Sequence, residues 1–231
     1  MIRIRVFRAI DELESCLKFV EGHTKILKVF DIAMITSANV EWFNDPNTFV
    51  IAAESTEDGR MLGGARVQIA GGKYPLPIEK AVKEIDERIK ESVEEHIPQG
   101  TGELCGLWNS REIAGMGIGS VYLTRTAVCI APQLKLKTLF ALCAPYTVEM
   151  GEKVGFRVTT FLGNNGTFYY PKQDLVATGM LLPDSYTLET AAPTEREEIF
   201  GIRENLKQKQ VAEGIRGKFD LYFDLEIKNK P

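Results

Sequence analysis

The fold is decided by the stretch Glu103-Leu104-Cys105-Gly106-Leu107-Trp108-Asn109-Ser110-Arg111-Glu112-Ile113-Ala114-Gly115-Met116-Gly117-Ile118-Gly119. Residues 103–109 predict a buried strand, and residues 115–119 predict a glycine loop. Residues 120–130 predict a helix that Pro132 helps to terminate. A glycine turn that opens a helix presents several backbone N–H groups at the positive end of the helix dipole. This arrangement suits an anion such as a phosphate group.

The segments around this stretch predict a mixed sheet. Upstream, residues 48–54 and 61–70 alternate as two strands of a hairpin around the turn at Asp58-Gly59. Downstream, apolar runs predict a strand, a helix and two further strands, at 138–144, 146–154, 156–162 and 176–182. An antiparallel hairpin followed by a strand–loop–helix–strand unit indicates the α/β (α+β) class, with helices on both faces of a central mixed sheet.

The remaining N-terminal segments predict one strand and three helices. Residues 1–7 alternate as a strand, and residues 12–20 place Leu13, Cys16, Leu17 and Val20 on one helical face. Residues 25–34 predict a second helix. Residues 78–97 predict a long, one-sided amphipathic helix inserted before the strand that begins at Glu103.

We divide the chain into a domain over residues 1–190 and a C-terminal extension over residues 191–231. The extension predicts a helix over residues 194–212 and a period-two strand over residues 219–225. This strand either returns to the sheet or pairs with a second chain, which would make a homodimer.

Bulk properties exclude several classes of protein. The net charge of −4 disfavours a chain that coats nucleic acid or an anionic membrane. No apolar run reaches the length of a membrane span, and the alternating N-terminus lacks the apolar run of a signal peptide. The four cysteines are too widely spaced for a zinc site or a disulfide framework, so we expect buried, reduced thiols, no bound metal and a cytoplasmic location.

The deciding stretch resembles motif A of the GNAT superfamily of N-acetyltransferases, E-L-x-x-L-x-V-x-P-x-x-R-G-x-G-I-G. It matches without a gap at Glu103, Leu104, Leu107, Gly115, Gly117, Ile118 and Gly119. Ala114 stands where the family usually has Arg or Gln. Residues 150–156, Met-Gly-Glu-Lys-Val-Gly-Phe, resemble motif B, F-Y-E-K-L-G-F. The resemblance covers residues 45–165, with the helix at 78–97 inserted.

The resemblance implies a GNAT fold in which two central strands splay apart and hold an acyl-coenzyme A, most simply acetyl-coenzyme A. Backbone groups at Leu107, Trp108 and Asn109 would bind the pantetheine arm. The amides of Gly115, Met116, Gly117, Ile118, Gly119 and Ser120 would hold the pyrophosphate. Without an Arg at position 114 this grip would be weaker but not abolished.

The same resemblance suggests which residues would do the chemistry. An amine acceptor must lose a proton before it attacks a thioester, so a general base is expected, and Glu103 occupies the position that supplies it in many relatives. Motif B often carries a Tyr that protonates the departing thiolate, but Gly151 stands there. Either that acid is absent, or Tyr146, Tyr169 or Tyr170 replaces it. Arg66 could bind an acidic acceptor.

Two residues show no site pattern. His23 and His96 lie at charged helical ends without partner spacing, so we expect both at the surface.

The preferred function is therefore N-acyl transfer, most simply N-acetyl transfer, from acyl-coenzyme A to the amine of a small molecule or peptide in a ternary complex. A first alternative comes from Gly63-Gly64-Ala65-Arg66-Val67 and the inserted helix. These resemble the G-C-x-R-L strand and insert of acyl-homoserine-lactone synthases and N-acyl amino acid synthases, which use long acyl chains from acyl carrier protein. A second alternative is a GNAT-like protein that binds acyl-coenzyme A without catalysis.

Overall fold

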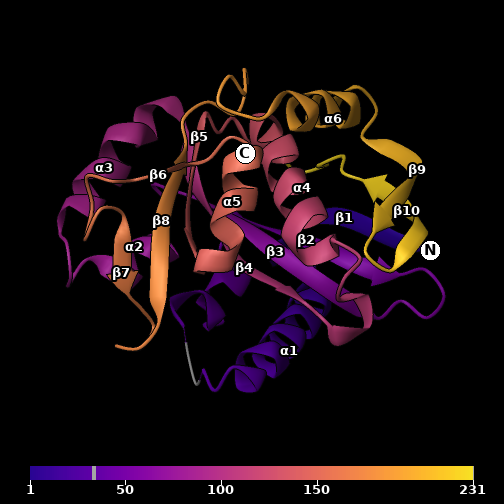
Figure 1. Cartoon of the computed structure of the whole chain (residues 1–231), viewed down its shortest axis with the longest axis horizontal. Helices are drawn as coiled ribbons and strands as arrows, with labels where there is room; N and C mark the ends of the chain where they lie inside the picture. Colours follow the sequence, from indigo (N-terminus) through magenta and orange to yellow (C-terminus); the bar gives the residue numbers. More distant parts are fainter. Residues whose placement is uncertain (33–34, 231) are drawn as a thin grey trace.

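The structure, a computed structural model, describes residues 1–32 and 35–230. One ten-stranded mixed sheet runs through the molecule in the order β6-β8-β5-β4-β3-β2-β1-β10-β9, with β7 paired to β8 (Figure 1). The pairings β4–β5 and β1–β10 are parallel, and the other pairings are antiparallel. The strands are β1 (Ile2–Arg8), β2 (Thr48–Ser55), β3 (Met61–Ile69), β4 (Thr101–Asn109), β5 (Thr138–Cys143), β6 (Arg157–Val158), β7 (Thr167–Tyr169), β8 (Val176–Leu182), β9 (Lys207–Gly214) and β10 (Gly217–Asp224).

Six α-helices flank this sheet in the described part of the chain. They are α1 (Leu13–Val29), α2 (Pro77–Val82), α3 (Arg88–His96), α4 (Leu123–Ile130), α5 (Pro145–Lys153) and α6 (Pro193–Glu204). None of them combines the length and the apolar character that a membrane span requires. The expected α/β (α+β) class with a central mixed sheet is confirmed.

The sequence alternation on β2 separates the two apolar faces of the sheet. Ile51 and Ala53 join the core under α4, whereas Val50 and Ala52 join a smaller cluster that contains Phe19 of α1 and Trp108 of β4. Neighbouring residues of a strand point to opposite faces, so α4 and α1 cover opposite sides of the same strands. Figure 1 shows α1 on one side of β3 and β4, with α4 and α5 on the other.

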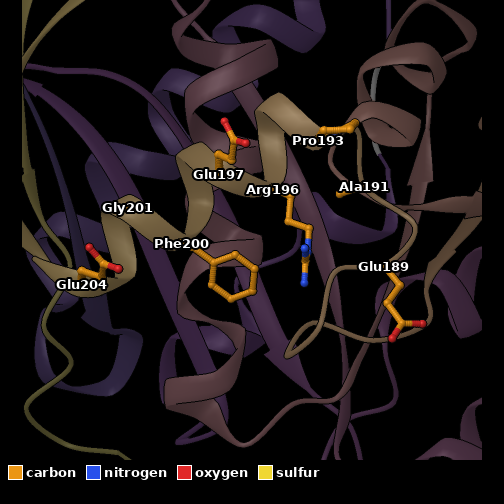
Figure 2. A pocket seen from close by; sticks show the side chains of 8 residues that line it. All are labelled: Glu189, Ala191, Pro193, Arg196, Glu197, Phe200, Gly201 and Glu204. Carbon is orange, nitrogen blue, oxygen red and sulfur yellow. The ribbon is translucent and has the colours of Figure 1, made fainter.

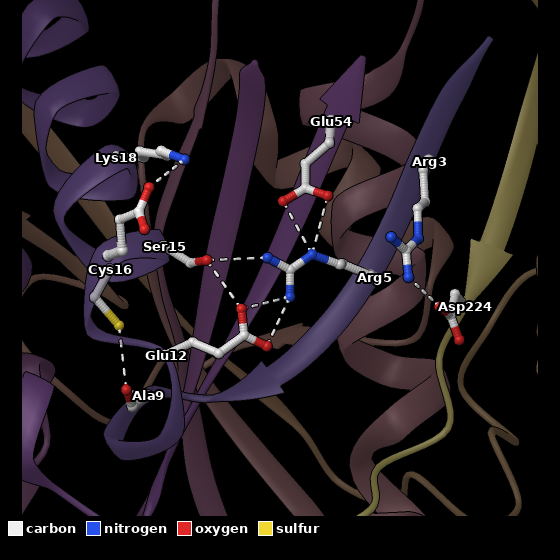
Figure 3. Close-up of polar contacts among 10 residues, drawn as sticks. Arg3, Arg5, Ala9, Glu12, Ser15, Cys16, Lys18, Glu54 and Asp224 are labelled. Atoms are coloured by element: carbon white, nitrogen blue, oxygen red, sulfur yellow. Dashed lines mark hydrogen bonds and ion pairs between the residues drawn. The ribbon is translucent and has the colours of Figure 1, made fainter. Parts of the chain in front are cut away.

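A polar network fastens β1 to its neighbours (Figure 3). Arg5 on β1 donates to both carboxylate oxygens of Glu54 on β2 and to those of Glu12, in each case at 2.9 Å. Its third nitrogen donates to the hydroxyl of Ser15 at the start of α1, at 3.0 Å. On the other side of β1, Arg3 donates to Asp224 of β10. The half-buried Arg5 therefore fixes the start of α1 against the sheet.

The first two predicted helices form one helix, so the expected break between them is wrong. Helix α1 runs without interruption through Gly22, which lies directly against the ring of Trp108; a Cβ at Gly22 would come within 2.0 Å of that ring. The predicted apolar face is wrong in part: Cys16 and Val20 do pack against the core under the helix. Leu13 and Leu17 are exposed, and the side chains turned to the sheet are Cys16, Phe19, His23 and Leu27. Met34, the expected end of the second helix, lies outside the described residues.

The helix predicted over residues 78–97 is divided into α2 and α3, which corrects the single inserted helix. Asp86 stands at the break, where one of its oxygens accepts the backbone N–H of Arg88 at 3.1 Å and the other accepts that of Gly163 at 2.8 Å. Such capping by a short carboxylate competes with continued helix. The two helices pack over β5 and β7 through Ile78, Val82, Ile89, Val93, Phe140 and Phe168.

One predicted strand and one predicted helix are shorter in the structure than the sequence predicts. The strand expected over residues 156–162 is reduced to Arg157–Val158. The helix expected over residues 194–212 ends at Glu204, and residues 207–214 form β9, which the sequence analysis missed. Charged and amide residues dominate β9, so its pattern resembled a helix; it is held by antiparallel pairing with β10.

The C-terminal strand returns to the sheet, where β10 pairs with β1 in parallel. Helix α6 is joined to α4 by Arg125, which is 8% exposed and donates two hydrogen bonds to Glu195, at 2.9 and 3.0 Å. The extension thus shares the sheet and the core of residues 1–190. The division at residue 190 and a homodimer both stay predictions.

Candidate active site

The two central parallel strands separate halfway along their length. β4 and β5 pair from Thr101 opposite Thr138 to Leu104 opposite Ala141. Beyond this point β4 continues to Asn109 and β5 to Cys143, with no pairing between them in the described structure. Parallel strands that part in this way leave backbone groups and a gap between them.

A kink in β4 directs the strand away from β5. Gly106 has φ of 61°, in the left-handed region that glycine adopts without steric cost. The pairing of β3 with β4 shifts register at the same level, between Gly64 and Arg66. A bulge of this kind bends a strand and increases its twist, and bulges are common beside active sites.

A cavity of about 630 Å³ occupies the gap between the separated strands. Its walls come from β4, β5, β8, the start of α5, and the C-terminal half of α1 with the segment after it. Most of the lining is apolar, with Ile26, Leu27, Leu104, Ala177 and Met180 among its residues. The titratable side chains in the lining are Glu103, His23, Cys105, Cys143, Tyr146 and Tyr170.

Glu103 contributes a buried carboxyl group to this cavity. It is 2% exposed, and its Oε2 accepts the backbone N–H of Ile78 at the start of α2, at 2.7 Å. Burial raises the pKa of Glu103 to about 8, although the Ile78 hydrogen bond and the charge of Arg66 act in the opposite direction. A carboxyl group that changes charge near neutral pH is suited to general acid–base chemistry.

Arg66 is fully buried beside this carboxyl group. It is 1% exposed, and its guanidinium lies 4.4 Å from the centroid of the Trp42 ring. Arg66 does not line the large cavity; it lines a small pocket of about 10 Å³ together with Trp42, Gln68 and Tyr74. Its charge acts on the groups that do line the cavity, Glu103, Cys105 and His23.

The expectation that His23 lies at the surface is wrong. The side chain is 3% exposed, lines the cavity from α1, and stands edge-on to Phe19 with ring centroids 6.0 Å apart. Burial, followed by the charge of Arg66, lowers the pKa of His23 to about 4. The four-residue spacing of Phe19, His23 and Leu27 was a signal in the sequence for a shared helical face. His96 is half-buried and lies outside the cavity lining.

The cysteines are free thiols, as expected. Cys16, Cys105 and Cys129 are buried and Cys143 is half-buried. Burial raises the pKa of Cys105 to about 12 and raises that of Cys143 as well. Both thiols in the cavity wall therefore stay protonated at neutral pH and are weak nucleophiles.

The three tyrosines considered as proton donors are placed differently. Tyr146 lines the cavity but is 79% exposed at the start of α5. Tyr169 is also largely exposed, on β7, and is not part of the lining. Tyr170 lines the cavity, and its hydroxyl accepts the backbone N–H of Thr36 at 2.7 Å. The structure thus brings Tyr146 and Tyr170, but not Tyr169, to the same cavity as Glu103.

The glycine loop forms a sharp turn into a helix, as the sequence predicts. Gly115 and Gly117 have φ of 80° and 75°. The carbonyl of Gly117 accepts the backbone N–H groups of Val121 and Tyr122, at 2.9 and 3.2 Å. The helix begins as a π-turn over Ile118–Tyr122 and continues directly as α4. Its first N–H groups have no partner within the helix, which is the feature that suits an anion.

Arg216 supports this loop from the C-terminal hairpin, a contact that the sequence analysis missed. The guanidinium donates to the carbonyl of Glu112 at 2.7 Å, and the methylene groups lie 3.2–3.3 Å from the position of a Cβ on Gly115. Gly214 of β9 packs on the backbone of Met116. Arg216 and Glu112 are 104 residues apart in the sequence, and no local pattern indicates that they lie in contact.

The residues expected to bind a pantetheine arm lie on the separated part of β4. Leu107 lines the cavity, whereas the side chain of Trp108 is buried on the opposite side of the backbone, against Phe19 and Gly22 of α1. The side chain of Asn109 donates to the carbonyl of Ser110 at 3.1 Å. Trp108 could therefore meet a ligand through its backbone but not through its ring.

A second hollow of about 640 Å³ lies along α6 (Figure 2). None of the residues that line it belongs to β4. Its side chains, including Arg196, Glu197, Phe200 and Glu204, are mostly exposed, and Arg196 lies 5.2 Å from the Phe200 ring. The walls of this hollow are charged and mostly exposed, whereas the walls of the first cavity are mostly apolar, which is the usual character of a ligand-binding cavity. Within residues 1–32 and 35–230, no group of three or more His, Cys, Asp or Glu side chains could hold a metal ion.

No protein-family model and no curated protein matches the sequence. Solved structures do match the fold. FeeM, an N-acyl amino acid synthase from uncultured soil microbes, aligns with a TM-score of 0.62 at 11% identity, over 83% of this chain and 99% of its own. An acyl-CoA N-acyltransferase from Pseudomonas aeruginosa aligns with a TM-score of 0.54 at 14% identity, over 78% of this chain and 99% of its own.

A third structure extends the match to the C-terminal segment. BjaI, a CoA-dependent acyl-homoserine lactone synthase, aligns with a TM-score of 0.54 at 11% identity, over 100% of this chain and 95% of its own. The structure contains three features that the resemblance implies: the mixed sheet, the separation of β4 from β5, and the glycine loop. The chain therefore has the fold of the GNAT superfamily of acyltransferases.

Proposed function

We propose that this protein is an N-acyltransferase that moves an acyl group from acyl-coenzyme A to the amine of a small molecule or peptide. The observation that carries the proposal is the cavity that opens where β4 separates from β5. The buried carboxyl group of Glu103 and a mostly apolar set of side chains line this cavity together. The glycine loop that follows β4 supports a donor with a pyrophosphate, because its amides and its helix dipole favour a phosphate anion.

Glu103 is the group that would free the amine. Most amines carry a proton at neutral pH, and an ammonium group cannot attack a thioester. With a pKa of about 8, Glu103 is ionised in roughly a tenth of molecules at pH 7, and the ionised form can accept the proton. The buried site makes the ionised carboxylate a stronger base than an exposed glutamate.

The cavity supports an acyl group longer than acetyl. Its volume of about 630 Å³ falls in the range of roughly 300–1,000 Å³ that holds ligands the size of a drug molecule. Aliphatic side chains in its walls, such as Leu27 and Met180, would contact a hydrocarbon chain and remove it from water. This observation favours the long acyl chain of the first alternative over an acetyl group, while the glycine loop keeps acyl-coenzyme A as the proposed donor.

Two of the similar structures are described in ways that agree with this choice. FeeM is described as an N-acyl amino acid synthase, and BjaI as a CoA-dependent acyl-homoserine lactone synthase. Because the identities are 11% in both cases, these likenesses bear on the fold, and the acceptor of this chain needs its own experiment.

The first experiment measures donor binding. The melting temperature of the protein is compared with acetyl-, octanoyl- and palmitoyl-coenzyme A, since a ligand that binds the folded state stabilises it by mass action. We expect the largest increase with the octanoyl or palmitoyl thioester. An increase with acetyl-coenzyme A alone would contradict the longer acyl group, and no increase with any thioester would contradict the donor.

The second experiment measures turnover. Release of free coenzyme A is followed with a panel of amino acids and other primary amines, and the acylated product is identified by mass spectrometry. Amide formation with coenzyme A release supports the proposed function. Turnover only with acyl carrier protein would move the donor to the first alternative, and binding without turnover with either donor would favour a non-catalytic protein.

A further inference from the structure

His23 is a buried polar group in an otherwise apolar part of the cavity wall. It is 3% exposed, and Ile26 and Leu27 line the cavity beside it. In the described part of the chain no hydrogen bond to its ring is found, and its ring nitrogens are not fully buried, so they are accessible from the cavity. Its ring makes a T-shaped contact with Phe19. Buried polar groups are normally hydrogen-bonded, because an unpaired one costs free energy. A partner for His23 would therefore come from a molecule that enters the cavity.

The position of His23 is set by contacts of α1 with β4. Phe19, one helical turn earlier, lies 3.5 Å from the position of a Cβ on Gly106, the kink in β4. Gly22 lies against the ring of Trp108. These two contacts fix this turn of α1 over the part of β4 that has left β5. His23 thus lines the cavity at the level where β4 and β5 separate, on the same face of β4 as Glu103.

The state of the imidazole follows from its surroundings. The charged group that acts on it most directly is Arg66, and the other titratable groups of the cavity wall are Glu103, Cys105, Cys143, Tyr146 and Tyr170. Burial and Arg66 lower the pKa of His23 to about 4, so the ring is neutral at neutral pH. A neutral imidazole has one nitrogen that accepts a proton and one that donates a hydrogen bond.

Amide formation requires two protons to leave the nitrogen of an ammonium acceptor. The first must leave before attack, and Glu103 takes it in the function proposed above. The second leaves as the C–N bond forms and the C–S bond breaks. The departing thiolate needs one proton to become a thiol, and the proton taken by Glu103 is released to solvent. A single group that accepts the second proton from nitrogen and donates it to sulfur would serve this step.

We propose that His23 carries this second proton, taking it from the nitrogen of the attacking amine and giving it to the sulfur of the leaving thiol. The inference rests on the proposed acyl transfer. The step balances: nitrogen loses one proton, His23 is regenerated, and coenzyme A leaves as a thiol. An imidazolium in this cavity is unfavourable because of the apolar walls and Arg66, so it returns its proton readily.

Other groups of the cavity are less suited to this step. The hydroxyl of Tyr170 is engaged with Thr36, and Tyr146 is 79% exposed. The buried thiol of Cys105 has a pKa of about 12 and holds its own proton too firmly. His96 cannot substitute, because its ring nitrogen is 2.7 Å from the carbonyl of Ser92 and it does not line the cavity.

The test compares His23→Gln with His96→Gln, a matched control because the chain holds two histidines. With the donor and amine identified by the turnover screen, His23→Gln should lower kcat by at least about 100-fold. KM for the donor should change little, because Gln keeps much of the size and hydrogen-bonding capacity of His. His96→Gln should match the wild type. A wild-type kcat in His23→Gln would overturn the inference.

A second readout separates proton delivery from positioning. An acyl p-nitrothiophenyl ester releases a stable thiolate that needs no proton. With this donor the deficit of His23→Gln should shrink, whereas a merely structural defect would persist. An undiminished deficit would therefore overturn the role of His23 as proton carrier.

A third measurement needs no substitution at His23. The ring-nitrogen NMR signals of the two histidines can be assigned by their comparison with His96→Gln, which lacks one set. We expect the His23 signals to shift when octanoyl-coenzyme A binds. Signals that stay fixed with the donor bound would overturn the inference. If no thioester binds or is turned over, it is the proposed function that fails; if turnover is normal in His23→Gln, only the role of His23 fails.

Discussion

The backbone N–H of Ile78 donates a 2.7 Å hydrogen bond to Oε2 of Glu103, and this contact joins the inserted helix α2 to the candidate active site. Glu103 lies on β4 in the middle of the sheet, whereas Ile78 follows Pro77 at the first turn of a helix 25 residues earlier. The helix therefore covers the carboxyl group and provides a donor for it. Burial by this cover is the main reason why the pKa of Glu103 rises to about 8.

Replacing Glu103 with Gln should slow turnover without weakening donor binding. Gln keeps the acceptor for the Ile78 N–H but cannot take a proton, so kcat should fall by at least about 100-fold near neutral pH. Part of the rate should return in alkaline buffer, which supplies free amine. A pH–rate profile of both proteins checks this, and a variant with wild-type kcat at neutral pH would show that Glu103 is not the base.

The same substitution should change how stability depends on pH. The pKa of Glu103 rises from 4.5 to about 8 on folding, so between these values the folded state holds a proton that the unfolded state has lost. Wild-type stability therefore contains a contribution that is complete below about pH 4.5 and falls as pH rises to about 8. The stability of Glu103→Gln does not contain this pH-dependent decrease, because Gln does not titrate.

The melting temperature of Glu103→Gln relative to wild type should thus increase from about pH 5 to about pH 8. Thermal unfolding of both proteins followed by circular dichroism across this range measures the difference. A difference that stays constant with pH would mean that Glu103 titrates in the folded protein as it does in the unfolded chain.

A charge placed in the glycine loop should weaken donor binding. Gly117→Glu adds a side chain and a negative charge at the turn before the helix, so affinity for coenzyme A should fall by at least about tenfold. Gly59→Glu is the matched control, because Gly59 has φ of 69° in an open turn, close to the 75° of Gly117. Calorimetry that finds equal affinity in both variants would contradict a phosphate site at the loop.

The loop should also depend on Arg216. Arg216→Gln removes the guanidinium from the carbonyl of Glu112, and with it a nearby positive charge, so affinity for coenzyme A should fall by about threefold to tenfold. Lys218→Gln removes the same charge from the same hairpin. If both variants lose affinity equally, the loss comes from the change in net charge and not from the loss of the Arg216 contact with the loop. Affinity for S-acyl pantetheine, which lacks the pyrophosphate, should depend less on Arg216.

Filling the cavity should change the preferred acyl chain. Ala177 on β8 is buried and lines the cavity, so Ala177→Phe reduces the space available. Palmitoyl-coenzyme A should then raise the melting temperature less than it does in the wild type, while acetyl-coenzyme A keeps its effect. The short thioester is the internal control for folding, and unchanged stabilisation by the long one would place the acyl chain elsewhere.

The sequence by itself determined the glycine loop, the strand before it and the class of fold. These features depend on neighbouring residues: φ near 80° at Gly115 requires glycine, and the alternation of β2 requires two apolar faces. Glu103 is singled out through the resemblance of residues 103–119 to motif A. The expectation that it opens the strand is wrong, because β4 begins at Thr101.

Only the tertiary structure decided what surrounds these residues. His23 has the same helical neighbours whether it faces solvent or the sheet, and it became part of the cavity because Gly22 and Phe19 fit against Trp108 and Gly106. Arg216 reached the loop because β10 pairs with β1, a contact between the two ends of the chain. The cover over Glu103 depends on α2, and burial is a sum over distant segments that no local pattern contains.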